Sequence, residues 1–277
     1  MTRSLLSFLI ALAPVPLLAQ GVLVAPHAVI IDHRTRSGSL SLYNPSTEPA
    51  EISLSTFYGY PVSDSAGDFQ LRTVEAPDST APSAAGWIEA FPKRMVLAPK
   101  ERQTVRLLAR PPANLADGEY WARLVVSAKG GTVLVRGLAD SSGVSVGLSL
   151  EVRTVLPMQY RKGRVTAGVR LSDLSVRVEG DSLAVRPHLT RTGNGAYLGT
   201  LRAVLRDSAG RVVASLASPL AVYYEMAPRL TAPLPPAGLP AGSYRVEVEA
   251  AAERDDIAPD LVLASPPERS SLAVRLP

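Results

Sequence analysis

The 277-residue chain contains no cysteine. It therefore forms no disulfide, has no thiolate to complete a zinc site, and offers no cysteine for lipid attachment at a processed N-terminus. Exported domains that lack disulfides are unusual when they are small. A chain of this length, however, buries enough apolar surface to fold without covalent cross-links.

Aromatic residues and clustered charges are also scarce. Aromatics make up 5% of the chain, and the net charge of +4 comes from scattered arginines. A nucleic-acid interface would need a basic stripe with interleaved aromatics, and the sequence has none. We expect the basic residues between Lys93 and Arg110 to form solvated faces.

Long apolar runs are absent apart from one at the start of the chain. Arg3 precedes an apolar stretch, Leu5–Leu18, which two prolines interrupt, and Leu17-Leu18-Ala19 is a plausible cleavage site. The stretch is short for a membrane span. The pattern is typical of a secretory signal, so we expect residues 1–20 to be a signal peptide and the mature protein to be periplasmic, with no membrane span.

Motifs for catalysis or metal binding are missing. His27, His33 and His188 lack metal-ligand spacing, no G-x-S-x-G elbow occurs, and Gly130-Gly131 lacks the residues that follow in a phosphate loop. A Ser-His-Asp triad stays open because its members need not be neighbours. The acidic residues between 253 and 260 could hold calcium, but a solvated turn fits their irregular spacing better. We expect a protein that is not an enzyme and has no cofactor, metal or catalytic residue.

What the chain has in quantity is turn residues and short β-type runs. It contains 20 glycines and 24 prolines, and its apolar runs are short and rich in β-branched residues. Seven such runs lie between Leu171 and Leu276, a number typical of an immunoglobulin-like sandwich. We therefore expect an all-β protein of two immunoglobulin-like β-sandwich domains in tandem, 21–162 and 163–277, with a break in the strand pattern over 156–163.

The most informative part of the first half is Trp87–Val126. Three runs, Met95–Leu97, Thr104–Ala109 and Tyr120–Val126, are separated by prolines and by an Asp-Gly turn, as in neighbouring antiparallel strands. Before them, the polar stretch 60–86 is either a mobile loop or carries a short extra strand around residues 69–74.

Residues 144–152 show a strict period of two. The apolar positions are Val144, Val146, Leu148, Leu150 and Val152. A strand with this pattern presents all its apolar side chains on one face. Two interpretations stay open: the face is offered to a partner that lacks a strand, or it packs into the core of its own domain.

The order of several motifs resembles the first domain of PapD-like periplasmic pilus chaperones, over about residues 22–162. The segments that carry the resemblance are Trp87-Ile88, Pro92-Lys93-Arg94-Met95-Val96-Leu97-Ala98-Pro99, Gln103-Thr104-Val105-Arg106-Leu107, Gly118-Glu119-Tyr120-Trp121 and Val29–Asn44. The resemblance implies two sandwiches that meet at an angle around a cleft. It also implies partners, namely secreted fibre or pilin-like subunits and an outer-membrane usher.

In that family an edge strand is donated to the subunit, and an Arg and a Lys in the cleft hold the subunit's terminal carboxylate. The corresponding positions here are near Ala28 and Pro157, and neither is basic. His27, Arg153 and Arg161 are the possible cleft anchors nearby. The resemblance thus favours a chaperone-like protein that binds fibre subunits with residues 144–152. The alternative is a non-catalytic structural or adhesive envelope protein with immunoglobulin-like modules.

Overall fold

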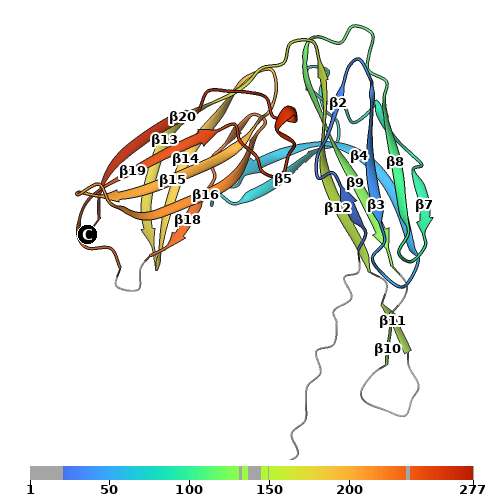
Figure 1. Ribbon diagram of the computed structural model, residues 1–277, viewed down its shortest axis with the longest axis horizontal. Helices are drawn as coiled ribbons and strands as arrows, with labels where there is room; N and C mark the ends of the chain where they lie inside the picture. The colour runs from blue at the N-terminus through green and yellow to red at the C-terminus, as the bar shows by residue number, and fades with distance from the viewer. Residues whose placement is uncertain (1–20, 131–132, 137–144, 149, 235–237, 277) are drawn as a thin grey trace, which may run out of the picture.

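The computed structural model describes residues 21–130, 133–136, 145–148, 150–234 and 238–276, so the expected signal peptide lies outside the described residues. Strands dominate this part of the chain, and one 3-10 turn, η1 (Pro259–Leu261), accompanies them. The strands form two immunoglobulin-like β-sandwiches in tandem, set at an angle to one another (Figure 1). The predicted fold class is confirmed, and the domain limits 21–162 and 163–277 stay a prediction. No helix of the described part is long and apolar enough to cross a membrane.

The first sandwich consists of two facing sheets. One has the order β1-β3-β8-β6, and the other β2-β12-β9-β4-β5, with β7 also paired to β4. The strands are β1 (Leu23–Ala25), β2 (Val29–Asp32), β3 (Ser37–Tyr43), β4 (Ala50–Ser63), β5 (Phe69–Val74), β6 (Ile88–Phe91), β7 (Arg94–Leu97), β8 (Arg102–Ala109), β9 (Gly118–Lys129) and β12 (Glu151–Lys162). A separate hairpin joins β10 (Val133–Arg136) to β11 (Ser145–Leu148).

Alternation of side chains explains how these strands bury a core. In β8, Val105 and Leu107 are fully buried, whereas Thr104 and Arg106 face solvent, as the sequence predicts. The same alternation in the facing strands fills the core with aliphatic side chains. The extra strand expected near residues 69–74 is present as β5, which pairs with the second half of β4.

The second sandwich repeats this plan with its own core. One sheet contains β13-β14-β17 with β18 also on β14, and the other has the order β16-β15-β19-β20. The strands are β13 (Ala167–Glu179), β14 (Ser182–Gly193), β15 (Tyr197–Asp207), β16 (Val212–Val222), β17 (Glu225–Met226), β18 (Leu230–Pro233), β19 (Gly242–Ala251) and β20 (Glu268–Leu276).

Two predicted breaks in strands are wrong. The pattern predicts an interruption over 156–163, but β12 runs without a break to Lys162, because β9 pairs with it along its whole length. The connection between the sandwiches is therefore short, 163–166. Two of the seven runs counted in the second half, Val212–Leu216 and Ala221–Tyr224, are predicted as separate strands, whereas β16 continues through Pro219 to Val222. Proline is tolerated there because β16 is the edge strand of its sheet.

Candidate functional site

The first half of β12 is an open strand edge. Its partner β9 pairs with residues 151–162, but on the other side β2 pairs only with Met158–Arg161. Among the described residues, no strand pairs with the outer edge over 151–157. Backbone N–H and C=O groups along this stretch are therefore free to pair with an added strand.

Apolar side chains are exposed along this edge. Leu150, which precedes the strand, is 46% exposed, and Val155, on the outward face of β12, is 40% exposed. The alternate residues Leu156 and Met158 point into the core of the first sandwich. The strand therefore packs into its own domain with one face and shows Val155 with the other.

The positions expected to bind a partner do not lie on one continuous strand. Val146 and Leu148 belong to β11, whose backbone pairs with β10, while Leu150 lies between β11 and β12. Val152 is half-buried on β12, and Val144 lies outside the described residues. Their role in binding a partner stays a prediction.

The three possible cleft anchors lie apart. His27 is exposed and lies near the second sandwich: the hydrogen bond from Arg254 lowers the pKa of Asp256 most, and His27 adds a smaller lowering. Arg153 is exposed and pairs with Glu151 at 2.8 Å. Arg161 lies eight residues further along β12, about 26 Å at roughly 3.3 Å per residue. The structure therefore does not bring these residues into one carboxylate site.

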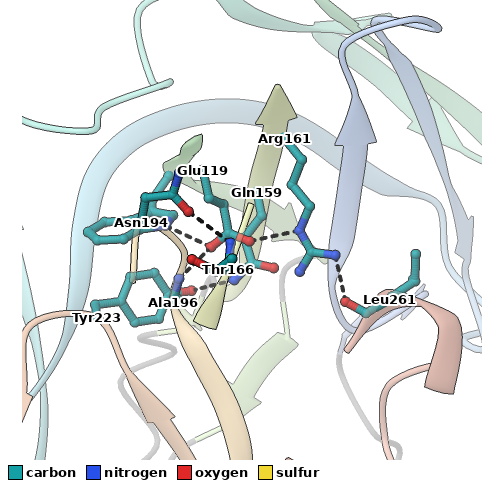
Figure 2. A network of polar contacts seen from close by, with 9 residues as sticks. Glu119, Gln159, Arg161, Thr166, Asn194, Ala196, Tyr223 and Leu261 are labelled. Carbon is teal, nitrogen blue, oxygen red and sulfur yellow. Dashed lines mark hydrogen bonds and ion pairs between the residues drawn. The ribbon is translucent and has the colours of Figure 1, made fainter. Parts of the chain in front are cut away.

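Arg161 takes part in a buried ion pair between β12 and β9. Its Nε donates to Glu119 at 2.8 Å, and the two side chains are 13% and 0% exposed, respectively. The other oxygen of Glu119 accepts hydrogen bonds from the indole of Trp121 and from the Ala196 amide, both at 2.9 Å. Because Ala196 precedes β15, this carboxylate ties the first sandwich to the second (Figure 2).

Arg161 and Asn194 extend this connection. Arg161 also donates to the Leu261 carbonyl at 2.7 Å, while its Nη2 is buried without a partner in the described structure. The Asn194 carbonyl accepts from the Glu119 amide at 3.2 Å, and its side-chain oxygen accepts from the Thr166 amide at 2.8 Å (Figure 2). We call Glu119, Arg161 and Asn194 the linker-side network.

An aromatic cluster fills the rest of the junction. Trp121 meets Tyr223 edge-on with ring centroids 4.7 Å apart, and the hydroxyls of Tyr58 and Tyr224 are 2.8 Å apart. The guanidinium of Arg123 lies 4.9 Å from the Tyr223 ring centre, a cation–π geometry. Each of these contacts joins one sandwich to the other.

Burial at the junction raises the pKa of two tyrosine phenols. Loss of water raises the pKa of the Tyr58 phenol, and the hydrogen bond with Tyr224 raises it further. The pKa of Tyr223 is also raised, again mainly by burial. Both phenols therefore stay neutral and act as hydrogen-bonding groups at physiological pH.

Sequence reasoning missed the residues that make this junction. Glu119, Arg123 and Gln159 are buried polar residues, and Asn44 is the other one in the described chain. Glu119 occurs within the Gly118–Trp121 motif, but nothing local signals its burial. Arg123 faces Pro157 across the β9–β12 pair, so it places a cation beside the expected lysine position. In the described chain, no three His, Cys, Asp or Glu residues gather in a way that could hold a metal ion.

No protein-family model matches the chain, and no curated protein sequence matches it. Solved structures are similar in fold. The YadV chaperone is 14% identical with a TM-score of 0.47, covering 91% of this chain and 99% of that one. A chain of the Salmonella enterica complex of SafA pilin with the SafB chaperone is 16% identical with a TM-score of 0.44, covering 91% and 96%. A chain of the Acinetobacter baumannii CsuC–CsuE chaperone–tip subunit complex is 13% identical with a TM-score of 0.44, covering 91% and 97%.

Proposed function

We propose that this protein is a periplasmic, non-catalytic chaperone that binds secreted fibre or pilin-like subunits through the open edge of β12. The observation that carries the proposal is the unpaired edge over 151–157, with Val155 and Leu150 exposed beside it. An incomplete subunit would add a strand to this edge, and its backbone hydrogen bonds would supply affinity.

The two kinds of contact have separate tasks in this proposal. Ladder hydrogen bonds do not depend on the subunit's side chains, so one edge can serve several subunits. Apolar side chains at alternate positions fill pockets of the subunit and select among them. The expected positions Val144, Val146, Leu148 and Leu150 would extend this contact before β12, and Val152, at the start of β12, would contribute from the face opposite to Val155.

The proposal is tested by capture of partners in the periplasm. A tagged full-length chain is expressed in its host, and the co-purifying proteins are identified by mass spectrometry. We expect pilin-like subunits with the wild-type chain and their loss with the double variant Leu150→Asp, Val155→Asp, because charges on the edge oppose pairing. Val96→Asp is the matched control, since Val96 is equally apolar and 64% exposed on β7.

Circular dichroism and urea unfolding establish that each variant is folded. Equal capture by the wild-type chain and the folded double variant would contradict edge pairing. Purification of the wild-type chain as a stable monomer without any subunit would favour a structural or adhesive envelope protein instead.

A further inference from the structure

One four-residue turn, Asp-Ser-Ala-Gly, occurs twice in the chain. Residues 64–67 close the hairpin between β4 and β5 in the first sandwich, and residues 207–210 close the hairpin between β15 and β16 in the second. Both turns end on a glycine in the left-handed region, Gly67 at φ 86° and Gly210 at φ 79°. Identical sequence and backbone make each turn an internal reference for the other.

The hydrogen bonds of the two turns also match. The carboxylate of Asp64 accepts from the amides two and four residues later, both at 2.9 Å. The carboxylate of Asp207 accepts from the equivalent amides at 3.0 and 2.9 Å. The glycine amide donates to the aspartate carbonyl in each turn, at 3.0 Å for Gly67 and 2.9 Å for Gly210. Local forces therefore hold the two turns in the same way.

Their surroundings differ completely. The Gly67 carbonyl accepts a hydrogen bond from the Arg229 amide of the second sandwich at 2.9 Å. A Cβ atom at Gly67 would lie 2.7 Å from the Arg229 Cβ and 2.9 Å from its amide nitrogen, closer than real contacts allow. A Cβ atom at Gly210 would meet nothing within 4 Å in the described part of the chain. Of the two turns, only the first contacts the other sandwich among the described residues.

The hairpin that carries this turn crosses from one sandwich to the other (Figure 1). Beyond Tyr58, β4 leaves the first sandwich. The ring of Tyr60 contacts the ring of Tyr224, and the hydroxyls of Tyr58 and Tyr224 form a hydrogen bond, so this part of β4 lies alongside the second sandwich. Beside the tip lies an open cavity of about 490 Å³, whose lining includes Asp64, Asp173 and His188. The tip therefore contacts the second sandwich at Gly67, next to this cavity.

We infer that the β4–β5 hairpin is a strap that fixes the angle between the two sandwiches. The linker-side network, together with the contacts of Trp121 and Arg123 with Tyr223, attaches β9 and β12 to the second sandwich, and the strap attaches the sandwiches at a second line of contact. One attachment alone would leave a hinge, whereas two separated attachments define an angle. This inference rests on contacts within the chain and is independent of the proposed function.

The test compares Gly67→Ala with Gly210→Ala in the full mature chain. Both changes place alanine at a positive φ, so both carry the same local strain, but only Gly67→Ala collides with Arg229. The chain has no cysteine, so Ser39→Cys and Ser215→Cys, which lie on exposed positions of β3 and β16, place one spin label on each sandwich. Pulsed electron resonance then measures the distance between the labels.

We expect a narrow distance distribution in the unsubstituted chain and in Gly210→Ala. Gly67→Ala should add a second, longer and broader distance, because the undocked sandwiches hinge at the linker. A folded Gly67→Ala protein with the unchanged narrow distribution would overturn the inference. If Gly67→Ala does not fold, Tyr58→Phe is measured instead, because it removes only the hydroxyl hydrogen bond to Tyr224. A broader distance distribution in Tyr58→Phe would support the strap, and an unchanged distribution would contradict it.

Discussion

The last strands of the two sandwiches, β12 and β20, have equivalent places but different surfaces. Each is paired with the preceding long strand of its sheet, β9 and β19, respectively. The outward positions of β20 include Arg269, Ser271 and Arg275, whereas those of the first half of β12 include Val155 beside the Arg153–Glu151 ion pair. Charged edges resist the addition of another strand, and apolar edges allow it. We therefore propose that a partner strand is added next to Val155 on β12 rather than on β20.

The two strands also contain equivalent ion pairs in opposite environments. Arg161 lies directly opposite Glu119, and Arg269 lies directly opposite Glu249 at 2.5 Å. The first pair is buried at the junction, while the Arg269 side chain is 69% exposed. An Arg–Glu ion pair therefore lies in the junction between the sandwiches in the first strand and on a solvent-exposed face in the second.

The largest expected effect concerns these ion pairs. Glu119→Ala leaves Arg161 buried without its carboxylate, so we expect a loss of about 3–5 kcal/mol in the free energy of unfolding. Glu249→Ala removes a solvent-screened pair and should cost less than about 1 kcal/mol. Urea denaturation of both variants measures the difference, and equal losses would contradict the distinction between a buried and an exposed pair.

A change that makes β12 resemble β20 should have the next largest effect. Val155→Lys places a charge on the open edge, and we expect at least about a tenfold weaker capture of subunits, equivalent to about 1.4 kcal/mol. Stability should change by less than about 0.5 kcal/mol, because Val155 is exposed. Titration of a captured subunit against both proteins checks this. Undiminished affinity would mean that β12 is not the contact.

Two buried tyrosines should respond oppositely to loss of their hydroxyl. Tyr58→Phe breaks the bond to Tyr224 and should cost about 1 kcal/mol. The Tyr197 hydroxyl is buried with no hydrogen-bond partner among the described residues, and burial raises its pKa to about 12. Tyr197→Phe should therefore be neutral or slightly stabilising, by up to about 1 kcal/mol. Thermal unfolding measures the stability of both variants. A destabilised Tyr197→Phe would contradict the assignment of an unpaired hydroxyl.

The smallest effect concerns the two Asp-Ser-Ala-Gly turns. Backbone amides hold the pKa of Asp64 and of Asp207 below the ordinary value of 3.8. Because the folded-state pKa is lowered, each carboxylate stabilises the fold above the ordinary pKa, and this contribution is lost as pH falls through the folded value. NMR titration should place both midpoints below 3.8. A midpoint at or above that value would contradict the hydrogen bonding of that turn.

The local sequence pattern was sufficient to predict the two sandwiches, because the alternation of apolar and polar residues in strands such as β8 indicates which face of the strand is buried. It failed at Pro157, where pairing with β9 carries β12 through a sequence that looks like a break. It also could not find the junction. The Glu119 carboxylate reaches the second sandwich through Ala196, a residue 77 positions away in the sequence. The repeated turn is visible in the sequence, but only tertiary position distinguishes Gly67 from Gly210.

The most direct test of the central claim is site-specific photo-crosslinking in the periplasm. A photoreactive residue replaces Val155 on β12 in one protein and the equally apolar, exposed Val212 on β16 in another. The account predicts a crosslinked fibre subunit from position 155, attached within a β-type segment of that subunit, and none from position 212. Equal crosslinking at both positions, or subunit adducts from position 212 alone, would contradict pairing at the β12 edge.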